Sequence, residues 1–262
     1  MTDITEPVRK SALDVIQYNL HAAGCNTYVT RVVYLGKYYG THEVLQKRME
    51  DIIHDLQMDY SDMPITGLFL IYPKYYIHLL EAWEDIIYKH YKLMYVTTEN
   101  NECKFGKAIP LPSYHHVHQR FFASWCHFYT IPPTLIGISE GHTLDDIQNQ
   151  VSNCLMKMYT LCEYVAKKSL DKKLINVQNV LRNLGDKAAR NLPESTVLEF
   201  LLSVNSPVLK TIEEYLQMHS DMSPSAFWDD NNVWPPPCDI MPRDVFDEHD
   251  RRKISCHPNS EK

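Results

Sequence analysis

The apolar residues between positions 28 and 130 form two kinds of pattern, short continuous runs and stripes with helical spacing. The short runs are rich in aromatic and β-branched residues and predict strands over 28–35, 65–72, 75–80, 107–111 and 120–129. Between them, apolar residues three and four positions apart predict helices over 41–56, with Thr41 as N-cap, and over 81–91. We expect Gly36 to end the first strand. This β-α-β-β-α-β-β order predicts an α+β, ferredoxin-like sheet with both helices on one face.

The rest of the chain predicts helices and then an extended tail. Apolar residues three and four positions apart between Leu144 and Val165 predict a long helix that begins at Thr143 or Asp145. We expect this helix to cover the sheet face opposite the first two helices. Shorter helices are expected over 170–184, 193–202 and 206–218, and a short one near the N-terminus over 11–20. The predicted parts are an N-terminal arm (1–27), the ferredoxin-like domain (28–140), a helical extension (141–220) and an extended tail rich in proline, tryptophan and acid (221–262).

Composition and charge exclude several classes of function. The net charge of −7 over 262 residues argues against nucleic-acid binding, which requires a basic surface. No apolar run of about 18 residues is present, so no membrane span is expected. The seven cysteines form no CxxC pair and the first ten residues lack an apolar core, which together favour reduced thiols in a cytosolic or nuclear compartment, and we predict a cytoplasmic location. Glycine-rich phosphate-binding motifs are also absent.

Four stretches of the predicted sheet resemble the BLUF domain, a blue-light sensor that holds a flavin between the two helices of a ferredoxin-like sheet. They are Arg31-Val-Val-Tyr-Leu, Ile65-Thr-Gly-Leu-Phe-Leu-Ile-Tyr, Ile77-His-Leu-Leu-Glu and Phe122-Ala-Ser-Trp. This resemblance covers residues 28–130. Along its whole length the chain is also similar to a family of animal BLUF-like proteins that are expressed in testis.

The BLUF resemblance implies a role for four positions. In BLUF photoreceptors a tyrosine on the first strand bonds a glutamine on the third strand, and that glutamine contacts the flavin. Tyr34 matches the tyrosine, and His78 occupies the glutamine position. Tyr60 falls where an asparagine grips the flavin edge, and Trp125 matches a tryptophan near the flavin. Both amide side chains of the family's site are therefore missing from this chain.

The two missing amides predict a scaffold that holds no cofactor. Each unmade hydrogen bond in a buried site costs about 1–3 kcal/mol, so flavin binding should be roughly 30-fold to ten-thousand-fold weaker. The alternative is an FAD-binding sensor with altered photochemistry that uses Tyr34 and His78. A third alternative is a small-molecule sensor with a pocket between the helices at 41–56 and 81–91.

Other constellations favour structural roles. His115, His116 and His118, followed by Cys126 and His127, are residue types that zinc prefers, but no recognised ligand spacing is present. We interpret them as a solvated polar segment and predict no metal site.

Catalysis is not predicted either. The chain has no GxSxG nucleophile elbow and no protease signature around its cysteines. The pair of Tyr34 and His78 is interpreted as a hydrogen-bonded pair of the core. We therefore predict that the protein is not an enzyme.

The sequence thus favours an interaction protein. In the tail, Phe227, Trp228, Val233 and Trp234 are candidate partner-binding residues, because isolated aromatic anchors in a polar, proline-rich segment are typical of segments that bind a groove. Equally, the two tryptophans could pack back on their own domain. The testis-family resemblance implies protein partners in a sperm flagellum or motile-cilium axoneme, and the C-terminal helices are a candidate dimer surface.

Overall fold

The computed structural model describes residues 11–22, 28–95, 104–133, 143–171, 177–185 and 189–220. The chain divides into two units, Met1–Leu216 and Gln217–Lys262. The candidate partner-binding residues Phe227, Trp228, Val233 and Trp234 lie outside the described residues, so their role stays a prediction. Among the described residues, no helix has both the length and the apolar character that crossing a bilayer requires.

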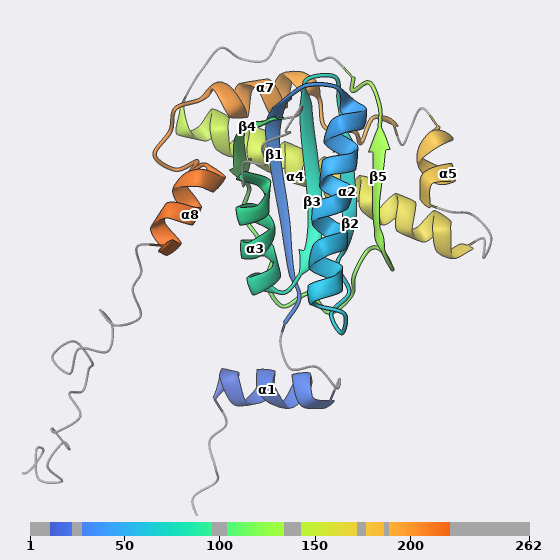
Figure 1. Ribbon diagram of the computed structural model, residues 1–262, viewed down its shortest axis with the longest axis vertical. Helices are drawn as coiled ribbons and strands as arrows, with labels where there is room; N and C mark the ends of the chain where they lie inside the picture. Colours follow the sequence, from blue (N-terminus) through green and yellow to red (C-terminus); the bar gives the residue numbers. More distant parts are fainter. Residues whose placement is uncertain are drawn as a thin grey trace, which may run out of the picture. The chain divides into compact units, whose positions relative to one another are not determined.

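The core of the first unit is a five-stranded sheet with the order β4-β1-β3-β2-β5 (Figure 1). Its strands are β1 (Thr30–Tyr39), β2 (Thr66–Ile71), β3 (Tyr75–Ala82), β4 (Lys104–Pro110) and β5 (Trp125–Tyr129). β3 lies antiparallel between β1 and β2, β4 pairs antiparallel with β1, and β5 pairs parallel with β2. The first four strands therefore have ferredoxin-like topology, which confirms the predicted fold class.

Helices cover both faces of the sheet (Figure 1). The helices among the described residues are α1 (Ala12–Ala22), α2 (His42–Asp59), α3 (Glu84–Tyr95), α4 (Leu144–Asp171), α5 (Val177–Arg182), α7 (Ser195–Ser203) and α8 (Ile212–Ser220), and α1 belongs to neither core cluster of the sheet. Alternate side chains of a strand point to opposite faces. Accordingly, Tyr34 and Leu80 pack with α2 and α3, whereas Leu35 and Leu79 pack with α4 and α7. The prediction that the long helix covers the opposite face is confirmed.

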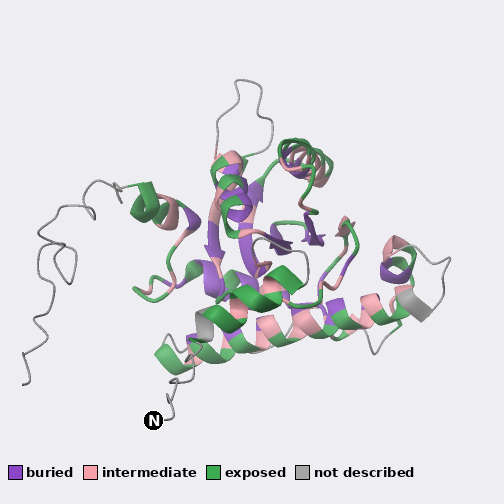
Figure 2. Cartoon of the chain, turned by 90° about the horizontal axis from the view of Figure 1, so that it is seen from below, coloured by how far each residue is buried: buried purple, intermediate pink, exposed green. Residues whose placement is uncertain are grey.

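Burial follows this layered arrangement. Figure 2 shows the strands in the colour of buried residues and the outward sides of the helices as exposed. Every residue of β2 and of β3 is buried. β2 and β3 therefore contribute side chains to the core on both faces of the sheet.

The predicted end of the first strand was wrong. β1 continues through Gly36 to Tyr39, and Gly36 lies opposite Tyr76 on β3. A Cβ atom at position 36 would overlap the phenol of Tyr76. The glycine thus makes room for a neighbouring ring rather than ending the strand.

The predicted start of the helix after the third strand was also wrong. β3 extends through Glu81 to Ala82, and α3 begins only at Glu84. Glutamate is typical of the first turn of a helix. The side chain of Glu81 is instead fully buried, and it accepts hydrogen bonds from Arg31 on β1 and Thr66 on β2.

Two of the C-terminal helices begin at threonines that pair with an acid three residues later. At α4, the amide of Asp146 donates to Thr143 Oγ1 over 3.2 Å, which identifies Thr143 and not Asp145 as the cap. At α8, the amide of Glu214 donates to Thr211 Oγ1 over 3.1 Å. α8 therefore begins at Ile212, six residues after the predicted start at 206.

Candidate functional site

Tyr34 and His78 lie side by side at the centre of the sheet. They are directly paired across β1 and β3, and both face α2 and α3. The Tyr34 hydroxyl oxygen is 2.6 Å from His78 Nδ1. The structure thus forms the hydrogen-bonded pair that the sequence predicts.

Two further side chains extend this pair. The indole Nε1–H of Trp125, on β5, donates to His78 Nε2 over 2.9 Å. On the other side, the Tyr34 hydroxyl oxygen is 2.6 Å from His90 Nε2, on α3. The sequence placed His90 or Tyr91 on the inner face of that helix but gave His90 no role. The available signal was a histidine one turn after Ile86 and Ile87 on an otherwise apolar stripe.

Burial sets the protonation of both histidines. Burial lowers the pKa of His78 well below its ordinary value, and the nearby His90 lowers it further. Burial alone lowers the pKa of His90 to about 3. Both imidazoles are therefore neutral at physiological pH, and each carries one N–H group.

With both rings neutral, the donors and acceptors follow in one direction. An indole N–H only donates, so His78 Nε2 accepts and its Nδ1 carries the proton. His78 Nδ1–H then donates to Tyr34, whose hydroxyl donates to His90 Nε2. We call this directed series, Trp125 to His78 to Tyr34 to His90, the relay. It leaves His90 with a proton on Nδ1.

The N–H at His90 Nδ1 is the one polar group of the relay that no described residue bonds. His90 Nδ1 is buried and has no hydrogen-bond partner within the described part of the chain. The other polar atoms of the relay are satisfied by each other. The ring of Tyr34 is further enclosed by the rings of Tyr76 and Tyr91, at centroid distances of 6.1 and 5.4 Å. Side chains of the protein itself therefore fill the space around Tyr34.

Tyr60 takes no part in the relay. It follows α2 as the C-cap residue and is only half-buried. Its ring lies beneath the ammonium of Lys89 on α3, with 4.6 Å between the nitrogen and the ring centroid. The structure thus joins three of the four predicted site residues and leaves Tyr60 at the outer end of the two helices.

His115 and His127, two of the histidines considered as zinc ligands, each contact other side chains. Both ring nitrogens of His115 lie near hydroxyls, Nδ1 at 3.3 Å from Thr30 and Nε2 at 3.0 Å from Ser113. His127 Nδ1 is 3.1 Å from the carboxylate of Glu50. Over the described ranges, no three side chains of metal-ligand type come together.

The family of the chain follows from a match over most of its length. The family model of testis-expressed protein 47 matches residues 28–221, which include the sheet, the relay and the helices of the opposite face. This chain belongs to the testis-expressed protein 47 family. The predicted relation to an animal family expressed in testis is thereby confirmed. No curated protein sequence is significantly similar to the chain.

Solved structures similar to this family member include photoreceptor proteins. A bacterial light-regulated adenylyl cyclase is 24% identical, with 53% of this chain and 36% of that chain covered and a TM-score of 0.31. The BLUF domain of BlrP1 is 12% identical, with 40% and 66% covered and a TM-score of 0.32. BlsA in its photo-activated state is 14% identical, with 68% and 97% covered and a TM-score of 0.28. The fold assignment itself rests on the sheet topology.

Removing the central hydroxyl of the relay is expected to destabilise the fold. Tyr34→Phe leaves a buried donor on His78 and a buried acceptor on His90 without partners, which should cost about 2–3 kcal/mol. Urea unfolding followed by circular dichroism measures this difference. Tyr18→Phe, an exposed tyrosine on α1, is the matched control and should leave stability unchanged. Equal stability of Tyr34→Phe and the wild type would contradict the relay.

Proposed function

We propose that this protein is a non-enzymatic interaction protein, built on a BLUF-like sheet that has lost flavin photochemistry. The observation that carries the proposal is the relay. Its polar groups are hydrogen-bonded to side chains of the protein itself, whereas a BLUF site directs such groups to flavin. In this reading the protein holds no cofactor. It serves as a structural component of a larger assembly.

The relay holds His78 from both sides. Its Nε2 accepts from Trp125 and its Nδ1 lies against Tyr34. A carboxamide can rotate and exchange a donor for an acceptor, whereas half a turn of an imidazole replaces both bonded nitrogens with carbons. Both hydrogen bonds of His78 would then be lost inside a buried site. The light-driven rearrangement that the BLUF resemblance implies therefore has no equivalent at this position.

The three buried cysteines among the described residues do not favour catalysis by a thiol. Burial raises the pKa of the Cys126 and Cys154 thiols to about 12 and that of Cys162 well above its ordinary value. A thiol is a nucleophile only as the thiolate. These three cysteines act as core residues, which supports a non-enzymatic role.

Membership of a testis-expressed family supports a setting in sperm or in a motile cilium. We propose protein partners in the axoneme, a cytoplasmic location, and the C-terminal helices as a candidate dimer surface. Neither nucleic acid nor a membrane is among the proposed partners, in line with the net charge of −7.

An absorption spectrum tests the cofactor part of the proposal. The full chain, purified with added FAD and then desalted, is expected to be colourless before and after blue light. The double variant His78→Gln/Tyr60→Asn restores both amides and is expected to retain more flavin than the wild type. A flavin band retained by the wild type would overturn the cofactor-free reading, and a reversible shift in blue light would establish the sensor alternative.

Detergent extraction of sperm tests the proposed setting. An axonemal component should remain with the insoluble axoneme when detergent removes membranes and cytosol, and immunoblotting of the two fractions measures this. Tubulin provides the control for the insoluble fraction. Complete release into the soluble fraction would contradict the structural role.

A further inference from the structure

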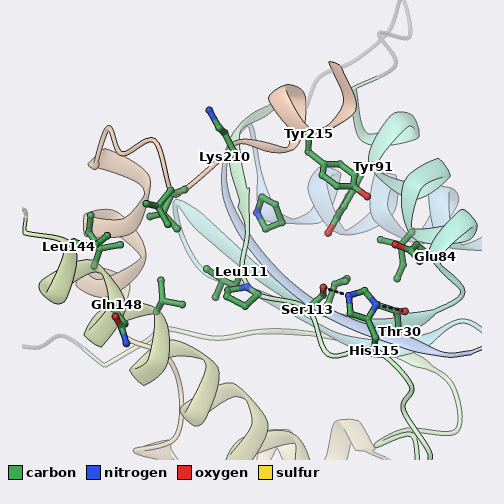
Figure 3. Close-up of a pocket in the computed structure, with 18 residues that line it drawn as sticks. Thr30, Glu84, Tyr91, Leu111, Ser113, His115, Leu144, Gln148, Lys210 and Tyr215 are labelled. Atoms are coloured by element: carbon green, nitrogen blue, oxygen red, sulfur yellow. Dashed lines mark hydrogen bonds between the residues drawn. The ribbon is translucent and has the colours of Figure 1, made fainter. Parts of the chain in front are cut away.

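A second feature of the molecule lies beside the relay, where the edge strand β4 ends. A pocket of about 600 Å³, partly open to solvent, is lined there by residues of β1, α3, the segment after β4, the start of α4, the loop before α8, and α8 itself (Figure 3). Its volume is in the range of small-molecule sites, about 300–1,000 Å³. No residue of the relay lines it.

Apolar side chains form most of the pocket wall. They include Val32, Ile87, Leu111, Ile147, Val151 and Leu209. Two formally charged side chains of opposite sign, Glu84 and Lys210, complete the lining, so their charges balance. His115 points its two ring nitrogens at Thr30 and Ser113 (Figure 3). The wall therefore favours a neutral ligand.

One polar group in this wall lacks a partner. Tyr91 lines the pocket and is only 2% exposed, and its hydroxyl has no hydrogen-bond partner in the part of the chain that the structure describes. Figure 3 shows its side chain reaching from α3 toward the pocket. Burial raises the pKa of Tyr91, so the hydroxyl stays protonated and can donate. Buried polar groups are nearly always bonded, and an unbonded one requires an explanation.

We propose that this pocket binds a neutral, largely apolar small molecule whose carbonyl or hydroxyl oxygen accepts a hydrogen bond from Tyr91. The apolar wall provides the area that removes such a molecule from water. The Tyr91 hydroxyl fixes its orientation. The pocket shares no residue with the relay, although the ring of Tyr91 packs against that of Tyr34, and the proposal does not depend on the loss of flavin binding.

Nile red, a neutral apolar dye with a ring carbonyl, is a suitable probe. Titrated into the full chain, it is expected to bind saturably at one site, with a rise in fluorescence. Tyr91→Phe keeps the ring and removes the donor, so it should weaken binding about fivefold, equivalent to about 1 kcal/mol. Tyr88→Phe, on the same helix but outside the lining, is the control and should bind like the wild type.

A second pair of variants tests the position of the dye. Gln148 is exposed at the rim on α4, so Gln148→Trp should obstruct the pocket without disturbing the fold and reduce affinity at least tenfold. Its exposed neighbour Asn149 does not line the pocket, and Asn149→Trp should have no effect. Absence of saturable binding would overturn the proposal. Saturable binding that neither Tyr91→Phe nor Gln148→Trp changes would also overturn it, because the dye would then occupy another surface.

Discussion

Replacing Glu81 by leucine is expected to lower the free energy of unfolding by about 3–5 kcal/mol. Glu81 is fully buried at the end of β3. Its carboxylate accepts from Arg31 Nε over 2.7 Å and from Thr66 Oγ1 over 2.9 Å. The backbone N–H of Phe121 also donates to it, with 3.1 Å to Oε2. Removing the carboxylate leaves the nearly buried Arg31 guanidinium without its counter-ion and two other donors without their acceptor.

The carboxylate binds the segment before β5 through the Phe121 N–H, and other contacts hold that segment against the sheet. Arg31 Nη2 donates to the carbonyl of Gln119 over 2.9 Å, and its guanidinium lies 3.9 Å from the centroid of the Phe121 ring. Arg120 Nη1 donates to the backbone carbonyl of Glu81 over 2.6 Å. Loss of Glu81 should therefore loosen this segment as well as weaken the core.

Urea unfolding followed by circular dichroism measures the effect. Glu163 forms an exposed ion pair with Lys167 on α4, so Glu163→Leu is the matched control and should change stability by less than about 0.5 kcal/mol. The double variant Arg31→Met/Glu81→Leu removes both charges of the ion pair, so no guanidinium stays buried without its counter-ion at position 31. This double variant should be more stable than Glu81→Leu alone. A loss below about 1 kcal/mol for Glu81→Leu would show that the cluster contributes little.

Acid should destabilise this protein strongly because the relay holds two neutral histidines. In the unfolded chain a histidine binds its proton near pH 6.5, whereas burial keeps the pKa of His90 at about 3 and that of His78 well below its ordinary value. Below pH 6.5 the unfolded state therefore binds more protons than the folded state. Folding stability is complete above this pH and falls as the pH drops toward the folded pKa values.

The expected loss is large. His90, whose folded pKa is about 3, lowers the free energy of unfolding by up to about 1.4 kcal/mol per pH unit below pH 6.5, which is about 2 kcal/mol between pH 7.5 and 5.0, and His78 adds to this loss in the same direction. Carboxylates that titrate in the same range add to the slope in every variant. The contribution of the relay is therefore the difference between slopes, measured by urea unfolding at a series of pH values.

Two glutamine variants isolate the contribution of the relay. His90→Gln should reduce the slope between pH 6 and pH 5 by about 1.4 kcal/mol per pH unit, since glutamine does not titrate. His54→Gln, which replaces an exposed histidine on α2 outside the relay, is the comparison variant. If the slopes of the wild type and His90→Gln coincide, His90 is not held neutral by the fold.

The sequence by itself determined the order of the elements, the fold class and the family. The spacing of apolar residues along a strand or a helix indicates which of its sides is buried. This information comes from residues that are close together in the sequence. It located β2, the hairpin to β3, and the helix that covers the second face. It also paired Tyr34 with His78, because the family's motifs place both positions on neighbouring strands.

Only the tertiary structure decided which polar residues are buried, and with which partners. Glu81 resembles a residue of a helix first turn, and Gly36 resembles a strand end. Both instead lie within strands, where Arg31 and Tyr76 approach them from another strand. His90 joins the relay through packing of α3 on β1, and the pocket at Tyr91 combines residues from Thr30 to Tyr215. Such contacts depend on how distant segments pack, which the spacing of residues along the chain does not encode.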